Sequence, residues 1–253
     1  GEIMMNETQV ALVAGSATGV GRACAVKLAT HGFDVVVNYP GADHEEAEET
    51  VRLVKEQGRE ALLIKCDVSV DQEVISMIAK VEQAFERLDA VVNAAGFTHF
   101  VEHADLDGMT EEKWDAIFAV NTKGPFFVIR AAARLLQQQP SSAIVNVSSV
   151  AGISGAGSSL AYCASKGALN TLTKSLARTL APNIRVNAVC PGPIDSRWLR
   201  EGMTEEAIAD RVASFPIPKL SKPEDIADTV CYLANGTSMT TGQLLTVDGG
   251  RTM

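Results

Sequence analysis

The stretch VALVAGSATGVG, residues 10–21, combines a short apolar run with three glycines. Residues 22–31 follow with Ala, Val and Leu at helical spacing, and Gly32 ends that pattern. In a strand, glycine turn and helix, glycines let the backbone approach a pyrophosphate at the positive end of the helix. The spacing Gly-x-x-x-Gly-x-Gly differs from the commoner Gly-x-Gly-x-x-Gly, and a tight turn alone needs the same residue type. In this context the stretch favours dinucleotide binding.

The alternation of strand and helix patterns continues along the chain. Strands are predicted at 33–39, 61–66, 88–93, 143–147, 184–189 and 244–247, and helices at 43–57, 71–87, 114–139, near 204–212 and from 221 onward. No low-complexity linker or tandem repeat interrupts them. This order predicts an α/β fold with a doubly wound parallel sheet of the Rossmann type, in one domain over residues 10–253.

Two segments stand apart from this pattern. Residues 1–9 are expected to be an N-terminal extension, in which Gly1 is interpreted as a cloning remnant and Met4 or Met5 as the natural first residue. Residues 194–218 are irregular around one short helix, which is typical of a mobile substrate lid.

Composition narrows the classes of function. The net charge of −9 and the pI near 5.0 argue against nucleic acid or an anionic membrane as a partner. No apolar run approaches the roughly 18 residues needed to span a bilayer, and the start lacks the pattern of a signal peptide. The five cysteines are scattered without a Cys-x-x-Cys pair, as expected of reduced, buried thiols. We therefore expect a cytoplasmic protein.

Tyr162 and Lys166 are the first candidates for chemistry. Residues four apart share one face of a helix, so the phenol and the ammonium can point into one cavity. A nearby lysine charge lowers the pKa of a phenol from its usual value of about 10. Ser148 and Ser149 stand at the carboxyl end of the predicted strand 143–147, where open α/β sheets bind ligands. Alone, the pair also fits an interfacial tyrosine and a solvated lysine, so other motifs must decide.

Three further side chains have an ordinary interpretation. His99 and His103 are four apart, but they lie in a predicted loop without a third ligand nearby, so we expect no metal site. Cys163 points about 100° away from Tyr162 on the helix and is expected to pack. Asn121 lies inside a predicted helix, where an asparagine is normally solvent-facing.

Taken together, the motifs resemble the short-chain dehydrogenase/reductase family in its single-domain form, from Val10 to Gly250. Gly15, Gly19 and Gly21 match the cofactor loop of the family, although Ala14 stands where threonine is usual. Residues 93–96, Asn-Ala-Ala-Gly, resemble the family's Asn-Asn-Ala-Gly with the second asparagine replaced. Both departures remove polar side chains that brace the loop, which predicts a less rigid loop.

The resemblance implies a role for each candidate. Tyr162 exchanges a proton with the carbonyl oxygen, and Ser149, thirteen residues earlier, hydrogen-bonds that oxygen. Lys166 lowers the tyrosine pKa and holds the nicotinamide ribose, and the main chain of Asn121 holds a water in the proton relay. The implied activity is hydride transfer between a nicotinamide and a carbonyl or secondary alcohol, without a metal. A non-catalytic nucleotide-sensing protein is the alternative, which loss of Tyr162 or Lys166 would have favoured.

Cofactor contacts implied by the resemblance follow the strand ends. They are Gly15, Ser16, Thr18, Gly19, Val20, Gly21, Asn38, Tyr39, Asp67, Val68, Asn93, Ala94, Ala95, Gly96, Tyr162, Lys166, Pro191, Gly192, Ile194 and Ser196.

Tyr39 decides the expected cofactor. Enzymes that prefer NAD usually carry an acid at the end of the second strand, and Tyr39 stands there instead, which favours NADP(H) over NAD(H). Against this, Thr18 and Pro40 are not basic, and three acids follow at 43–46. Arg22 contributes only if its side chain turns back toward the adenosine.

Within the family the chain looks most like 3-oxoacyl-[acyl-carrier-protein] reductases. The predicted walls of the site, around Phe97, Ser149, Ile194 and residues 150–159 and 198–215, are mostly small or apolar, which fits a neutral carbonyl and an acyl thioester among them. Docking of an acidic carrier would need a basic patch from Arg130 and Arg134 or from Arg197 and Arg200, and the net charge disfavours it. A ketone, sugar or polyol dehydrogenase is the alternative.

The helical stretches at 114–139 and 160–180 are rich in Ala, Leu and Val beyond what one sheet-facing stripe requires. We expect a homotetramer, with a dimer as the second choice.

Overall fold

The structure, a computed structural model, describes residues 8–196, 199–200 and 204–253 of the chain. The predicted cloning remnant at Gly1, most of the N-terminal extension, Arg197 and part of the predicted lid lie outside these residues.

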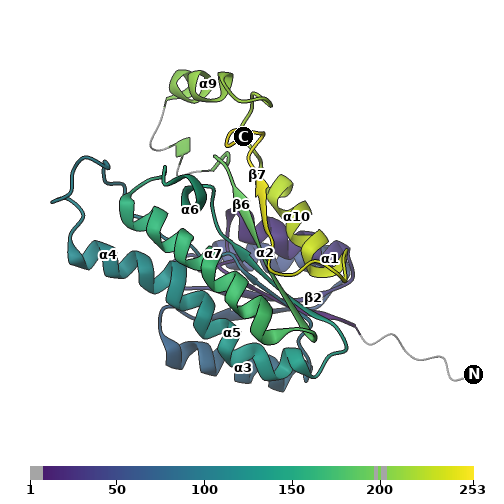
Figure 1. Cartoon of the computed structure of the whole chain (residues 1–253). Helices are drawn as coiled ribbons and strands as arrows, with labels where there is room; N and C mark the ends of the chain where they lie inside the picture. Colours follow the sequence, from purple (N-terminus) through teal and green to yellow (C-terminus); the bar gives the residue numbers. More distant parts are fainter. Residues whose placement is uncertain (1–7, 197–198, 201–203) are drawn as a thin grey trace, which may run out of the picture.

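The described residues form a sheet of seven parallel strands in the order β3-β2-β1-β4-β5-β6-β7 (Figure 1). The strands are β1 Val10–Ala14, β2 Asp34–Tyr39, β3 Ala61–Lys65, β4 Ala90–Asn93, β5 Ser142–Val147, β6 Ile184–Pro191 and β7 Leu244–Val247. The order reverses between β1 and β4, and open α/β sheets bind their ligands at such a switch point, outside the carboxyl ends of the strands. The predicted doubly wound sheet is confirmed.

Helices cover both faces of the sheet (Figure 1). They are α1 Gly19–Thr30, α2 His44–Glu56, α3 Asp71–Phe85, α4 Glu111–Phe118, α5 Gly124–Gln137, α6 Ala151–Ser154, α7 Leu160–Leu180, α9 Glu205–Ala213 and α10 Pro223–Asn235. Alternate residues of β1 point to opposite faces of the sheet and pack against different layers of helices. Ala11 and Val13 pack with α1, α2 and α10, whereas Leu12 packs with α3 and α5. The core is therefore two apolar clusters, one on each side of the sheet.

The sequence predicted one helix over residues 114–139, but the structure divides this stretch. A π-helical turn, η1 Ala119–Lys123, joins α4 to α5 and contains Asn121. Such turns take up one extra residue within a helix and are frequent at functional sites. The apolar spacing on either side is helical, so the interruption left no signal in the periodicity.

Other boundaries moved by a few residues. α1 begins at Gly19 and not at Arg22, because the glycine turn leads directly into the helix. β6 runs on to Pro191, two residues past the predicted end. α3 ends at Phe85, because Glu86 takes a left-handed conformation with φ 57°.

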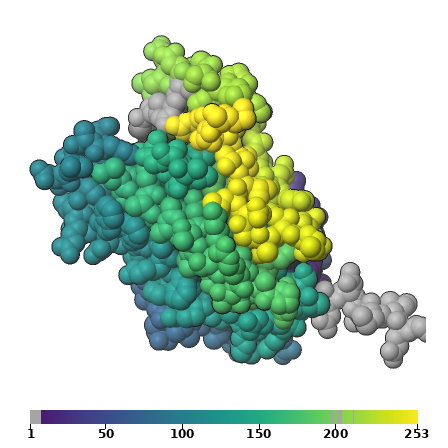
Figure 2. All heavy atoms as spheres, viewed as in Figure 1, coloured from purple at the N-terminus to yellow at the C-terminus, as the bar shows by residue number. Residues whose placement is uncertain are grey.

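The segment 194–218, predicted as a lid, is tied at its base. Ile194 forms a parallel bridge with Ser221, and the Asp195 N–H donates to the Ser221 carbonyl at 2.8 Å. Near its other end, the Ile217 N–H donates to the Gly249 carbonyl at 2.9 Å. α9 stands apart from the sheet in Figure 1, and Figure 2 shows the yellow C-terminal residues lying against this part of the molecule. The described part of the segment thus overhangs the carboxyl edge of the sheet from two fixed points.

No helix among the described residues has the length and apolar character needed to cross a bilayer.

Candidate active site

The glycine loop after β1 is packed so closely that side chains are excluded from it. A Cβ atom on Gly21 would lie 2.0 Å from the Gly15 carbonyl oxygen, and one on Gly15 would lie 2.5 Å from Cα of Ala95. Gly19 has φ +55° and no heavy atom within 4 Å of its Cβ position. The loop is therefore tight against β1 and β4 on one side and open at Gly19, as a pyrophosphate at the first turn of α1 requires.

Asn38 braces this loop from β2. Its buried side chain accepts a hydrogen bond from the Gly15 N–H at 3.0 Å and donates to the Cys66 carbonyl at 3.0 Å. The Ser16 hydroxyl accepts from the Asn38 N–H at 3.0 Å and donates to the Val13 carbonyl at 2.7 Å. These bonds brace the loop although Ala14 and Ala94 lack the family's polar side chains, and the rigidity of the loop stays a prediction. Asn38, a predicted cofactor contact, has its amide committed to protein atoms.

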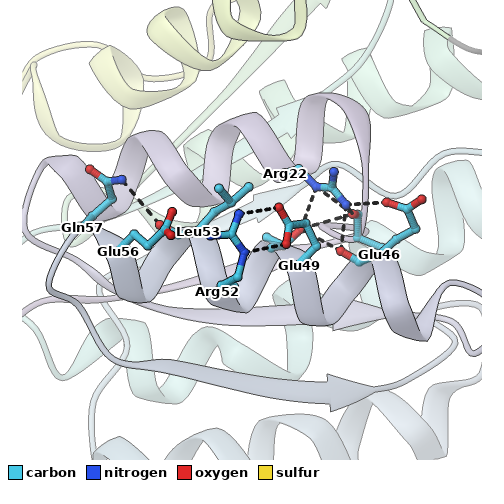
Figure 3. A network of polar contacts seen from close by, with 9 residues as sticks. Arg22, Glu46, Glu49, Arg52, Leu53, Glu56 and Gln57 are labelled. Atoms are coloured by element: carbon cyan, nitrogen blue, oxygen red, sulfur yellow. Dashed lines mark hydrogen bonds and ion pairs between the residues drawn. The ribbon is translucent and has the colours of Figure 1, made fainter.

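Arg22 holds the loop from its other side (Figure 3). Its guanidinium donates to the Ala17 carbonyl at 2.7 Å and to the Thr50 hydroxyl at 3.0 Å, and it pairs with the Glu46 carboxylate at 2.7 Å. The side chain thus joins the loop to α2, and its guanidinium is already bonded to protein atoms.

The predicted adenine contacts lie at the end of β3. The Asp67 carboxylate accepts from both the N–H and the hydroxyl of Ser69, at 2.9 and 2.7 Å, and so shapes its own turn. Val68 is buried, with Gly124 so near that a Cβ there would come within 2.9 Å of Cγ2 of Val68. Both positions reach the carboxyl edge, as the resemblance implied.

Tyr162 and Lys166 lie in the first turns of α7. The Ser159 hydroxyl caps this helix by accepting from the Tyr162 N–H at 3.2 Å. The Lys166 ammonium is buried, donates to the Val147 carbonyl at 2.9 Å and lies 5.8 Å from the centroid of the Tyr162 ring. Ser149 follows β5 beside them, and its Oγ accepts from the Ala151 N–H at 3.1 Å. The three predicted side chains meet at one place.

Burial controls the two titrating groups. It raises the pKa of the Tyr162 phenol above its usual value of 10, although a hydrogen bond with Ser149 acts in the opposite direction. Burial also lowers the pKa of the Lys166 ammonium from 10.5 to about 8. The tyrosine pKa is not lowered as expected, because burial is the largest cause of its shift and Lys166 is not among the causes. At neutral pH the phenol holds its proton.

Asn121 is fully buried within the π-helical turn, so the expectation of a solvent-facing side chain is wrong. Its Oδ1 accepts from the Phe97 N–H at 2.8 Å, and its Nδ2 donates to the Phe97 carbonyl at 2.9 Å and to the Ser165 hydroxyl at 3.1 Å. The side chain clamps the loop after β4 to Ser165 of α7, which is next to Lys166 and about one turn from Tyr162.

The predicted nicotinamide loop is fixed to two neighbours. The Pro191 carbonyl accepts from the Val150 N–H at 3.0 Å, next to Ser149, and the Gly192 N–H donates to the Val247 carbonyl at 2.9 Å. A Cβ on Gly192 would lie 2.7 Å from Cβ of Asp248, which requires glycine. Ser196 begins the helical turn that follows, since its carbonyl accepts from the Leu199 N–H at 3.1 Å.

Sequence reasoning missed a buried polar cluster behind the lysine. The Ser148 hydroxyl donates to Oδ1 of Asn170 at 2.6 Å, and Nδ2 of Asn170 has no partner. In the strand before the loop, Asn93 donates to Oδ1 of Asn146 at 2.9 Å, while its own Oδ1 has none. The signal was available, because Asn170 stands four residues after Lys166 and so shares its helix face.

Comparison with known proteins identifies the family of this chain. A family model described as Enoyl-(Acyl carrier protein) reductase matches residues 14–252. The 3-oxoacyl-[acyl-carrier-protein] reductase FabG of Staphylococcus aureus (strain Mu50 / ATCC 700699) is 38% identical over 251 residues, which covers 98% of this chain and 100% of the relative. This chain belongs to the short-chain dehydrogenase/reductase family.

Solved structures agree with that assignment. A short-chain dehydrogenase/reductase described from Burkholderia xenovorans superposes with a TM-score of 0.91 at 35% identity, covering 96% of this chain and 97% of that one. Acetoin dehydrogenase from Enterobacter cloacae superposes with a TM-score of 0.85 at 35% identity, covering 96% and 95%. This short-chain dehydrogenase/reductase is an oxidoreductase, and the family implies an NAD(P) cofactor. The glycine cradle and the open side at Gly19 fit such a cofactor.

Proposed function

We propose that the protein is a carbonyl reductase that favours NADP(H) and acts on a neutral ketone, with a 3-oxoacyl thioester as the first candidate substrate. The observation that carries this proposal is the meeting of Tyr162, Ser149 and Lys166 at the carboxyl edge, with the phenol protonated at neutral pH. A protonated phenol beside a hydroxyl group is suited to donate a proton to a carbonyl oxygen.

The side chains divide the work as follows. A nicotinamide, when bound, supplies the hydride for the carbonyl carbon. Tyr162 gives its proton to the carbonyl oxygen, and the Ser149 hydroxyl donates a hydrogen bond to the same oxygen. Lys166 stabilises the phenolate that remains, and its lowered pKa of about 8 lets it exchange protons near neutral pH. Asn121 positions the Phe97 peptide at the side of this cluster.

The mouth of the site supports a substrate with an apolar chain. Phe100 and Leu106, in the loop after β4, are 69% and 68% exposed, and Ile153 of α6, after β5, is 51% exposed. Both segments leave the sheet at its carboxyl edge, and the Val101 N–H joins them by donating to the Ser158 carbonyl at 3.1 Å. Exposed apolar side chains on both segments favour binding of an aliphatic or acyl group. The similarity to FabG points the same way.

The arginines expected to dock an acidic carrier protein are paired within the chain. Arg134 pairs with Glu82 at 2.5 Å, Arg200 pairs with Asp195 at 2.6 Å, and Arg130 pairs with Asp71. Arg197 lies outside the described residues. An acidic carrier protein would have to compete with these internal acids for the arginines. The pairing therefore favours a free thioester or a small ketone over a carrier-bound substrate. A small-ketone dehydrogenase, as the likeness to acetoin dehydrogenase suggests, is therefore the second candidate.

The test is a comparison of four substrates with both reduced cofactors. We expect the free acetoacetyl thioester to be reduced, and attachment of the thioester to a carrier protein to raise kcat/KM little. We expect a lower kcat/KM for acetoin and for polyol oxidation than for the free thioester. Tyr162→Phe serves as the inactive control. Inert thioesters beside rapid turnover of acetoin or a polyol would replace the first candidate by the second.

We further propose a homotetramer, with α4 and α5 in one interface. Trp114 is 39% exposed and stacks on Phe118 at 5.4 Å, and Phe126 is 38% exposed. An apolar surface on two neighbouring helices favours pairing with a second copy. Light scattering at micromolar concentration should give four times the chain mass; a dimer mass would favour the second choice, and a monomer mass would exclude both.

A further inference from the structure

Lys65, the last residue of β3, reaches across to the turn between β2 and α2. Lys65 and Tyr39 are register partners in the parallel pair of strands, so both stand at the carboxyl edge. A Cβ atom on Gly41 would lie 2.9 Å from Cε of Lys65 and 3.4 Å from its Nζ. The lysine side chain therefore lies over Gly41, which has φ +145° and leaves it room. An ammonium group is thus held beside the turn that follows β2.

This turn is where dinucleotide-binding sheets place the 2′ position of the adenosine ribose. The neighbouring groups are already committed. The Tyr39 hydroxyl is bonded to Nδ1 of His44 at 2.8 Å, the Asn38 amide braces the glycine loop, and Arg22 is paired with Glu46. Lys65 is exposed and belongs to none of the ion pairs found among residues 8–196, 199–200 and 204–253.

Two of the acidic side chains of α2 are engaged within the chain, whereas Asp43 and Glu45 keep their negative charge near this turn. Glu46 is neutralised by Arg22, and Glu48 lies 3.2 Å from Nε2 of His44. Asp43 stands at the N-cap without bonding its side chain to the helix, so the first N–H groups of α2 keep their capacity to donate. A phosphate at this turn would meet the Lys65 ammonium and the positive end of a helix of 13 residues.

We infer that Lys65, contributed by the third strand, is the residue of this chain that selects a ribose 2′-phosphate, and hence NADP(H). This inference rests on the proposed function, in which the cofactor is NADP(H). It moves the specificity-determining charge from the glycine loop and the end of β2, where Thr18 and Pro40 are not basic, to a neighbouring strand.

Lys80 offers a matched control. Lys65 and Lys80 line the same cavity of about 350 Å³ between β3 and α3, together with Gln72, Glu73 and Ser76. Lys80 belongs to α3, away from the β2–α2 turn. Loss of either lysine removes one positive charge from this part of the surface, but only loss of Lys65 removes it from the turn.

The experiment measures binding by calorimetry, without substrate. The ligands are 2′,5′-ADP and 5′-ADP, and NADPH and NADH, and the variants are Lys65→Met, Lys65→Arg and Lys80→Met. Hydrogen bonds between charged groups predict that Lys65→Met weakens 2′,5′-ADP and NADPH about tenfold or more. The ligands without a 2′-phosphate should change less than about twofold. Lys65→Arg should keep the preference, and Lys80→Met should resemble the wild type with every ligand.

The outcomes separate the inference from the proposed function. If the wild type prefers 2′,5′-ADP and Lys65→Met keeps that preference undiminished, the inference alone is wrong. If the wild type binds 2′,5′-ADP no better than 5′-ADP, the inference and the NADP(H) preference are both wrong, while the proton-transfer role of Tyr162 is untouched. Equal losses in Lys65→Met and Lys80→Met would mean that only the general surface charge matters, which also overturns the inference.

Discussion

Two halves of the carboxyl edge differ in how they treat buried polar groups. In the nucleotide half (β1, β2, α1 and α2), the side chains of Asn38, Ser16 and Arg22 all bond to protein atoms. In the reacting half (β4, β5, β6 and α7), Oδ1 of Asn93 and Nδ2 of Asn170 are buried without partners. Within the described part of the chain, the third such atom is Nε of Arg185, which stands at the opposite, amino end of β6.

The difference indicates that the two halves of one sheet edge are stabilised differently. The nucleotide half is complete before any ligand binds, so it offers a preformed surface at little cost in conformational entropy. The reacting half keeps a buried ammonium and unpartnered amide atoms, which cost stability and are common where chemistry occurs. The following experiments test that contrast, beginning with the largest expected effect.

Tyr162→Phe should abolish most of the activity and leave the nucleotide half intact. Loss of a general acid lowers kcat by about 10²–10⁴-fold, whereas dinucleotide affinity should stay within about twofold. Steady-state kinetics and calorimetry on the same preparation measure both. Near-native turnover would show that another group supplies the proton.

Gly21→Ala should act in the opposite way. A Cβ placed 2.0 Å from the Gly15 carbonyl oxygen must displace backbone, so the loop opens and dinucleotide affinity falls by about 100-fold, or about 2.7 kcal/mol. Gly58→Ala is the control, since Gly58 has φ +74° but no heavy atom within 4 Å of its Cβ position. The control should lose some stability through backbone strain and bind the dinucleotide normally. Normal binding by Gly21→Ala would mean that the loop is more adaptable than its packing indicates.

A matched pair of buried asparagines compares the two halves directly. Asn38→Leu leaves the Gly15 N–H and the Cys66 carbonyl without partners, which should lower the free energy of unfolding by about 3 kcal/mol. Asn170→Leu removes an amide whose Nδ2 is already unpartnered, and Ser148 keeps an acceptor in the Lys166 carbonyl at 3.3 Å. Its cost should be below about 1 kcal/mol. Chemical denaturation measures both, and equal costs would remove the distinction between the halves.

Lys166→Met should make the protein more stable at neutral pH. The folded-state pKa of this ammonium is depressed from 10.5 to about 8, so below pH 8 its charge is held at a cost of about 3 kcal/mol. Subtracting about 1 kcal/mol for the bond to the Val147 carbonyl leaves a gain of about 2 kcal/mol.

The depressed pKa of Lys166 fixes how the stability gained by Lys166→Met changes with pH. Between pH 8 and 10.5 the unfolded state binds more protons than the folded state, so this group's destabilising effect fades as pH rises through that window. The advantage of Lys166→Met over the wild type should therefore shrink from pH 7 to pH 10. Comparing the two proteins at each pH cancels the titration of the buried cysteines. An advantage that is constant or grows with pH would contradict the depressed pKa.

Much of the fold was predictable because the strands are apolar runs between glycines and polar turns. β1 and β7 lie where the sequence placed them, and the remaining strand boundaries moved by one or two residues. The site was predictable as a set of strand ends, which must meet at one edge of a parallel sheet. The meeting of Tyr162, Ser149 and Lys166 followed from that rule and from helical spacing.

The features that the sequence did not predict depend on burial and on contacts between distant segments. The direction of the Tyr162 pKa shift depends on how deeply the phenol is buried, and spacing in sequence carries no measure of burial. The brace from Asn38 left a faint signal, a polar residue within the apolar run VVVNY, but its partners come from two other segments, the loop after β1 and the end of β3. The π-helical turn left none, because its residues continue the helical spacing on both sides.

That turn has a consequence for the tolerated length of the chain. Removal of one residue from Ala119–Lys123 would let α4 and α5 join as an uninterrupted α-helix, a local gain in hydrogen bonding. Because the turn takes up one extra residue, the helix beyond it would keep its face, and Val128, Ile129 and Ala132 would stay buried against the sheet. The loss would fall on Asn121, whose side chain would release the Phe97 peptide. A single deletion here would thus spare the core and act on the loop beside the reacting atoms.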